Sequence, residues 1–184
     1  MKTFIITDTH FFHHNIITKF EFRPADFNKQ IIKNWCDMVS AEDIVYHLGD
    51  VIFKRAGELE WILAKCPGEK HLMVGNHDRQ KKTWFIDKGF KTAQKYVVIN
   101  YEGYKILLSH HPLDIAEIEK DHEHIDFNIH GHFHRMNREE HDRTAVGYPF
   151  YSERHVCLSI EEMEYKPIEI IDFLKLRIKT IFLS

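Results

Sequence analysis

Five short apolar runs in this 184-residue chain each end directly in histidine, aspartate or asparagine residues. The central run covers residues 71–78, where His-Leu-Met-Val is followed at once by Gly-Asn-His-Asp. The other four lie at residues 4–10, 44–50, 106–112 and 127–134. One such run is consistent with an ordinary turn, because Gly-Asn is a common turn pair. Five of them favour an α/β fold, in which the carboxyl ends of sheet strands present polar residues to a ligand.

In chain order, the polar ends read D-x-H at residues 8–10, G-D at 49–50, G-N-H-D at 75–78, S-H-H-P at 109–112 and G-H-x-H at 131–134. This order resembles the metallophosphoesterase (calcineurin-like phosphoesterase) superfamily. The wording D-T-H-F-x-H-x-N at residues 8–15 is similar to a small branch of bacterial and phage proteins, with Phe11 where many family members have glycine. The resemblance implies a four-layer α/β/β/α sandwich of two mixed β-sheets flanked by helices. Periodicity alone supports only alternating strands and helices.

The resemblance also implies a site for two divalent metal ions. The first ion would be held by Asp8, His10, Asp50 and His134, and the second by Asp50, Asn76, His110 and His132. Asp50 would bridge both ions through its two carboxylate oxygens. Carboxylate, imidazole and amide ligands without a thiolate suit manganese, with iron, zinc, cobalt or nickel as alternatives, rather than a structural zinc site. The competing interpretation makes Asp8 a helix cap and His10 a surface residue.

His77 and Asp78 are the predicted catalytic residues. Two cations about 3.5–4 Å apart lower the pKa of a bridging water, which provides a hydroxide for in-line attack on phosphorus. His77 holds no metal ion in the family pattern, so we expect it to protonate the leaving alkoxide, with Asp78 orienting its ring. The sequence leaves open a second role, in which a positively charged His77 binds phosphate and transfers no proton.

We therefore expect a dinuclear metal-dependent phosphoesterase, and a phosphodiesterase acting on small or nucleotide-type diesters in particular. The chain is short and lacks the large insertions that would build a groove for a protein substrate. The alternatives are a phosphomonoesterase, a binding module that has lost catalysis, and a structural protein that holds one zinc ion. The expected partner is a small phosphate ester, with nucleotides among the candidates, and no membrane or obligate protein partner is expected.

Several other polar residues near the motifs have no assigned chemistry. His13 and Asn15 either line the pocket or fix the loop around them. His47 and His130 precede the motif residues within strands, so we expect them to support the ligands and not to bind metal. Arg23 is expected on the solvated surface.

The composition indicates a globular protein, with 43% hydrophobic and 13% aromatic residues. A net charge of −3 excludes a general positive field that would hold nucleic acid by charge alone. Three widely spaced cysteines without a C-x-x-C pair indicate reduced thiols. The apolar run begins directly after Met1 and Lys2, and no run approaches the ~20 apolar residues of a membrane span. We expect one cytoplasmic domain over residues 1–184.

Apolar periodicity places the remaining elements. Helices are expected over residues 26–39 and 58–64, and a β-hairpin over residues 96–100 and 105–109. Residues 2–7, 43–48 and 127–129 are expected as buried strands, residues 135–152 as a polar rim and residues 156–160 as a last strand. Residues 168–183 are expected as a helix, although alternation within them leaves a strand open.

Overall fold

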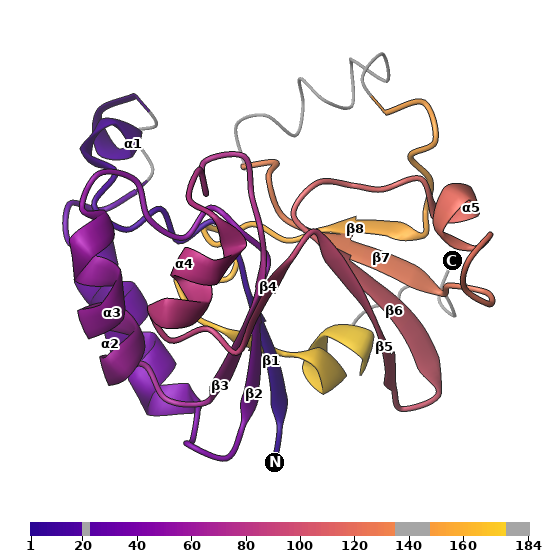
Figure 1. The fold of residues 1–184 in the computed structure, drawn as a ribbon, viewed down its shortest axis with the longest axis horizontal. Helices are drawn as coiled ribbons and strands as arrows, with labels where there is room; N and C mark the ends of the chain where they lie inside the picture. The colour runs from indigo at the N-terminus through magenta and orange to yellow at the C-terminus, as the bar shows by residue number, and fades with distance from the viewer. Residues whose placement is uncertain (20–22, 135–147, 176–184) are drawn as a thin grey trace.

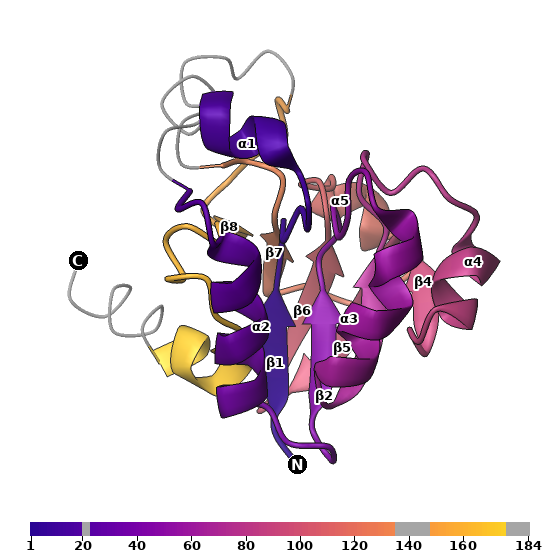
Figure 2. The ribbon, with the colours of Figure 1, turned by 90° about the vertical axis from the view of Figure 1, so that its left-hand side faces the viewer.

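The computed structural model describes residues 1–19, 23–134 and 148–175, which build two facing β-sheets with helices outside them (Figures 1 and 2). The first sheet has the order β4-β3-β2-β1-β9. Its strands are β1 (Thr3–Ile6), β2 (Ile44–His47), β3 (Glu69–Met73), β4 (Thr92–Gln94) and β9 (Ile168–Glu169). The strands β1 to β4 run parallel and β9 runs antiparallel to β1, so this sheet is mixed.

The second sheet has the order β5-β6-β7-β8 and is also mixed. Its strands are β5 (Tyr96–Tyr101), β6 (Tyr104–Ser109), β7 (Phe127–His130) and β8 (His155–Cys157). The pair β5–β6 forms the expected antiparallel hairpin, while β6, β7 and β8 run parallel. The predicted fold class of two mixed sheets with flanking helices is therefore confirmed.

Side-chain alternation explains why β1 is apolar throughout. Phe4 and Ile6 belong to the cluster that packs the first sheet against α2 (Phe27–Met38), α3 (Leu59–Lys65) and α4 (Lys82–Asp87). Ile5, between them in sequence, belongs to the cluster between the two sheets, together with Leu108 and Ile129. A strand with a packed layer on each face needs apolar side chains in both directions.

The outer layer over the second sheet is thin. It contains α5 (Ile115–Ile118), whose Ile115 packs with Leu107 and Ile125 in a small separate cluster. The remaining helical elements, α1 (His14–Lys19) and the 3-10 helix η1 (Ala56–Glu58), follow the first and second motif loops. Among the described residues, no helix has the length and apolar character needed to cross a membrane.

The C-terminal part differs from the predicted helix over residues 168–183. Ile168 and Glu169 form β9, which pairs with Phe4 and Ile5 on the free edge of β1, and the chain becomes helical only from residue 170. The strand predicted over residues 156–160 is shorter, because β8 ends at Cys157. Most of the predicted rim, residues 135–147, lies outside the described residues, as does the end of the predicted helix after residue 175.

Two neighbouring residues on α3 test the packing of the outer layer. Ile62 is 0% exposed in the core, whereas Trp61 is 49% exposed beside it. We expect Ile62→Ala to lower the free energy of unfolding by about 2–4 kcal/mol through lost burial and a cavity. Trp61→Ala should lower it by about 1 kcal/mol or less, because mainly its contact with Lys65 is lost. Urea denaturation measures both, and equal losses would contradict the placement of α3.

Candidate active site

The predicted ligands follow five strands that belong to both sheets. The loops after β1, β2 and β3 carry the motif residues of the first sheet, and those after β6 and β7 carry the motif residues of the second. In Figure 2, β1 and β2 point toward the end of the molecule at which α1 lies. The two sheets meet there, because His134 Nε2 after β7 lies 3.3 Å from His10 Nε2 after β1. The parallel strands thus bring distant parts of the chain to one place.

Four of the seven predicted ligands have a left-handed backbone. The φ angles are 50° for Asp8, 45° for His10, 55° for Asp50 and 70° for His132. Residues other than glycine rarely adopt this conformation, which costs about 1–3 kcal/mol at each position. Such strain persists only where the surroundings impose it, and it gathers at functional sites.

Asp50 lies at the centre of the site. Its Oδ2 is 3.5 Å from His10 Nε2 and 3.5 Å from His110 Nε2, while its Oδ1 accepts a hydrogen bond from the backbone N–H of His77 at 2.8 Å. One oxygen therefore faces both histidines, and the other is held by the loop after β3. Burial raises the pKa of Asp50 to about 7, although the charge of His110 acts in the opposite direction. This carboxylate is poorly compensated by the protein alone.

The first group of ligands contains Asp8, His10, Asp50 and His134. Oδ1 of Asp8 lies 3.9 Å from His10 Nε2 and 3.8 Å from His134 Nε2, and this buried oxygen has no hydrogen-bond partner in the part of the chain that the structure describes. Its Oδ2 accepts hydrogen bonds from the Thr7 hydroxyl and the backbone N–H of His132. Burial lowers the pKa of His10 well below its ordinary value, which keeps the imidazole in the neutral form that binds metal.

The second group contains Asp50, Asn76, His110 and His132. His110 Nδ1 donates a hydrogen bond to the carbonyl of Leu48 at 2.7 Å, so the neutral ring presents the lone pair of its Nε2 on the other side. That nitrogen faces Asn76 Oδ1 at 2.9 Å and Asp50 Oδ2 at 3.5 Å. Burial lowers the pKa of His132 to about 3, and its ring centroid lies 5.1 Å from that of His110.

The donor set fits a pair of divalent cations. The candidate ligand atoms form three overlapping groups, and the atoms within each group lie within 4.8 Å of one another. The groups belong to Asp8, His10 and His134, to Asp8, Asp50 and His110, and to His110, His111 and His132. Imidazole nitrogens and carboxylate oxygens face one another there, and Oδ1 of Asp8, which has no hydrogen-bond partner among the described residues, is buried among them. Such atoms repel one another unless a positive charge lies between them, and a metal ion provides that charge.

One known protein family matches the part of the chain that carries these motif residues. The family model for the calcineurin-like phosphoesterase superfamily domain matches residues 1–149 of this chain. The chain belongs to that superfamily. An uncharacterised protein of Methanocaldococcus jannaschii is 35% identical over 183 residues, which cover 95% of this chain and 90% of that protein. A crystal structure of a protein of unknown function from Aquifex aeolicus matches with a TM-score of 0.76 and 32% identity, over 95% of this chain and 98% of that chain. The predicted family is confirmed.

The two predicted catalytic residues of this calcineurin-like phosphoesterase take different positions. His77 lies at the mouth of the site with its side chain 33% exposed, and its Nε2 is 4.0 Å from Asp50 Oδ2. Asp78 is buried, and its carboxylate accepts hydrogen bonds from the backbone N–H groups of Asp50, Val51 and Gly75 at 2.8–3.0 Å. His77 Nδ1 has no hydrogen-bond partner among the described residues. The expected orientation of His77 by Asp78 is therefore not present as a hydrogen bond.

Arg23 corrects one prediction from the sequence. It was expected on the solvated surface, but it is only 3% exposed. Its guanidinium donates to the backbone carbonyls of Asp8 and Thr9 and to the carboxylate of Glu161. Arg23 is buried because these carbonyls belong to the left-handed turn after β1, where no β-ladder partner takes their hydrogen bonds. It acts as a support for the first group of ligands.

Two further residues of the site are not among the predicted ligands. Glu161 accepts a hydrogen bond from His134 Nδ1 at 3.2 Å, which turns Nε2 of that ring toward Asp8 and His10. Burial lowers the pKa of His134, but the hydrogen bond and charge of Glu161 outweigh it and the net shift is upward. His111 places its ring centroid 4.0 Å from that of His132. The sequence signal for His111 was its position inside S-H-H-P, whereas Glu161 had none.

The remaining polar residues either line the site cavity or lie outside it. His13 does both of the things expected of it, because its Nδ1 accepts from the backbone N–H of Ile16 and its ring lines the site cavity. Asn15 is exposed and is not among the residues that line that cavity. His47 is buried against Thr9 Oγ1 at 2.9 Å, and His130 is buried against the carbonyl of Gly131 at 2.9 Å. Both lie behind the ligands, as expected.

Gly75 tests the close approach that positions Asp50. A Cβ atom at Gly75 would lie 2.2 Å from Asp50 Oδ1 and 2.6 Å from Asp50 N, whereas one at Gly57 would meet nothing within 4 Å. We expect Gly75→Ala to lower the free energy of unfolding by about 1–3 kcal/mol, because the two loops must move apart. Gly57→Ala should change it by about 1 kcal/mol at most. Urea denaturation of both variants decides, and an unaffected Gly75→Ala would show that the loops do not approach this closely.

Proposed function

We propose that this calcineurin-like phosphoesterase is a dinuclear metal-dependent phosphodiesterase that acts on small or nucleotide-type diesters. The observation that carries the proposal is the position of Asp50 Oδ2, at 3.5 Å from a histidine of each ligand group. One carboxylate oxygen between two sets of nitrogen and oxygen ligands is suited to bridging two cations. The superfamily supports phosphoester hydrolysis, and the arrangement of these side chains supports two metal ions.

The residues that would hold the ions are those of the two ligand groups. Asp8, His10 and His134 would hold one ion, Asn76, His110 and His132 would hold the other, and Asp50 would contact both. When bound, two divalent cations neutralise the charge of a phosphate ester and make a water molecule acidic enough to react near neutral pH. Manganese is the first candidate, and iron, zinc, cobalt and nickel accept the same ligands.

His77 is proposed as the general acid. It is the one histidine of the G-N-H-D motif, it belongs to neither ligand group, and its ring is open to the cavity at the mouth of the site. As the oxygen of water bonds to phosphorus, the bond from phosphorus to the leaving oxygen breaks. That oxygen takes a proton from His77, and the ring regains a proton released from the water. The products are a phosphomonoester and an alcohol.

A substrate with a substantial leaving group is favoured by the shape around His77. This residue lines the site cavity of about 160 Å³ and also a second cavity of about 350 Å³. The second cavity can therefore hold a group attached to the leaving oxygen, on the side from which His77 donates its proton. A phosphomonoesterase is the alternative function, since the same metal site and acid serve both reactions.

Metal stoichiometry tests the bridging role. We expect the wild-type protein to bind two Mn²⁺ ions per chain and Asp50→Ala to lose both, because its Oδ2 is shared by the two ligand groups. Asp37→Ala removes an exposed carboxylate on α2 that pairs with Lys33, and should keep both ions. Calorimetric titration of chelator-treated protein, confirmed by elemental analysis, measures the stoichiometry. Retention of both ions by Asp50→Ala would refute the bridge.

Turnover tests the reaction. We expect Mn²⁺-dependent hydrolysis of bis-p-nitrophenyl phosphate, abolished by a chelator, with p-nitrophenyl phosphate cleaved more slowly. His77→Ala should lower kcat by about 10²–10⁴-fold, the usual contribution of a general acid, with the metal stoichiometry unchanged. His124→Ala, which removes an exposed histidine on the surface, is the matched control and should keep full activity.

The other outcomes are equally informative. Turnover of the monoester alone would favour the phosphomonoesterase. A fully active His77→Ala would remove His77 from the reaction and leave the metal proposal intact. Two bound ions without turnover of either ester would argue against an enzyme for these substrates and in favour of a binding module.

A further inference from the structure

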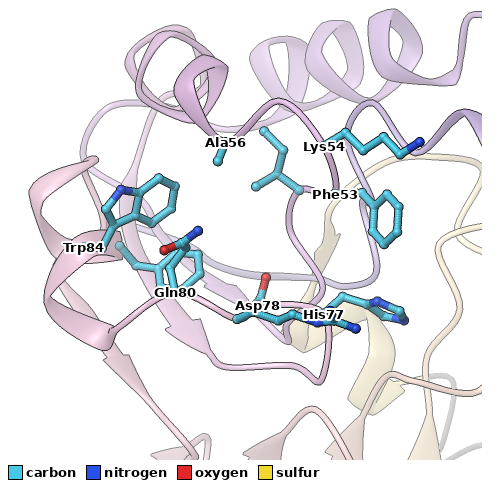
Figure 3. Close-up of a pocket in the computed structure, with 10 residues that line it drawn as sticks. Phe53, Lys54, Ala56, His77, Asp78, Gln80 and Trp84 are labelled. Atoms are coloured by element: carbon cyan, nitrogen blue, oxygen red, sulfur yellow. The ribbon is translucent and has the colours of Figure 1, made fainter.

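A second cavity lies beside the site. It has a volume of about 350 Å³ and is formed by the loop between β2 and η1, the loop after β3 and the helix α4 (Figure 3). This volume is near the lower end of the roughly 300–1,000 Å³ that small-molecule pockets have. His77 lines both this cavity and the site cavity. A ligand that occupies the second cavity would therefore lie next to the reacting phosphorus.

The cavity has aromatic side chains on opposite sides. Figure 3 shows Trp84 on one side and Phe53 on the other, with Asp78 and His77 along the lower edge and His77 below Phe53. Phe53 is 36% exposed although it is a large apolar residue, and it is held by stacking on His13, with the ring centroids 3.8 Å apart. Trp84 is half-buried and fixed edge-to-face against Phe85, with the centroids 5.0 Å apart. Rigid, partly exposed rings of this kind suit a flat ligand.

The cavity is lined by two cations, and the side chains of Lys54 and Arg79 make no ion pair or hydrogen bond with the described residues. Among the residues that line the cavity, Asp78 supplies the carboxylate, and its oxygens are occupied by the backbone N–H groups of the neighbouring loops. The cavity is therefore positively charged although the whole chain has a net charge of −3. An anionic ligand is favoured there.

Gln80 adds a side-chain amide that can form hydrogen bonds with the polar edge of a flat ligand. Its amide lies beside the ring of Trp84 and points toward the cavity (Figure 3). An amide both donates and accepts hydrogen bonds, as the edge of a nucleobase does. Aromatic rings stack on a base, an amide forms hydrogen bonds with its edge, and cations bind its phosphates. Together these groups are suited to recognising a nucleotide.

We infer that this cavity binds the nucleoside on the leaving-group side of a nucleotide diester, with its base against Trp84. The inference rests on the proposed function for the identity of the reacting phosphate, and it names the substrate class for the same site. His77 lines both cavities and Phe53 packs edge-to-face on it, with the ring centroids 5.6 Å apart, so the sugar would pass beside His77. Lys54 and Arg79 would face a further phosphate of the nucleotide.

The test compares ligands that differ only in the base. Binding of AMP and of ribose 5-phosphate to the Mn²⁺-loaded protein is measured by calorimetry, with phosphate release followed in parallel so that only intact ligand is counted. We expect AMP to bind at least about fivefold more tightly, the lower end of what base–aromatic stacking contributes. The ratio should fall toward one in Trp84→Ala and be largely restored in Trp84→Phe. Trp61→Ala removes an exposed tryptophan elsewhere and should keep the wild-type ratio.

Three results would overturn the inference. They are equal affinity for AMP and ribose 5-phosphate, an unchanged ratio in Trp84→Ala, and binding of phenyl phosphate as tight as that of AMP. If Trp84→Ala does not fold, Phe53→Ala and Gln80→Ala carry the same test, because both side chains are exposed. A protein that prefers AMP but does not hydrolyse bis-p-nitrophenyl phosphate would support the cavity and reject the proposed reaction. Hydrolysis of that diester without a preference for AMP would do the reverse.

Discussion

Two buried carboxylates hold together the loops on which the site depends. Asp78, after β3, accepts hydrogen bonds from the backbone of Asp50 and Val51, after β2. Asp50 in turn accepts from the backbone N–H of His77, after β3. Each loop thus satisfies the other, and the close approach requires glycine at position 75. A buried carboxylate that lost these N–H donors would be strongly destabilising, so the two loops keep one relative position.

This bracing explains how the left-handed backbone at the ligands persists. Asp8, His10 and Asp50 are each held by backbone hydrogen bonds between the first two loops, as in the pairs Asp8 N to Gly49 O and His10 N to Asp50 O. Arg23 adds bonds to the carbonyls of Asp8 and Thr9 from outside the sheet. The strain in each residue is offset by bonds that exist only in this conformation. The result is a braced set of predicted ligands in which Oδ1 of Asp8 faces His10 and His134.

The sequence predicted the strands and the candidate ligands, because both depend on patterns of neighbouring residues. Apolar runs located the strands because a strand packed on both faces has no polar positions, as Phe4, Ile5 and Ile6 show. The motif order located the candidate ligands because each follows a parallel strand. Arg23 and Glu161 escaped prediction because their contact spans 138 residues and depends on how two loops fold toward each other. The short β9 escaped it because Ile168 and Glu169 are strand residues only through the free edge of β1.

The role of Asp78 shows why residue type alone does not settle function. A carboxylate next to a histidine in G-N-H-D is consistent with an acid that orients a catalytic ring. In the fold, three backbone N–H groups donate hydrogen bonds to Asp78, and they satisfy its oxygens more fully than one imidazole would. His77 instead turns toward Phe53 and the cavity that holds the predicted ligands. The residue that fixes the loops and the residue proposed to give the proton are therefore neighbours in sequence with separate tasks.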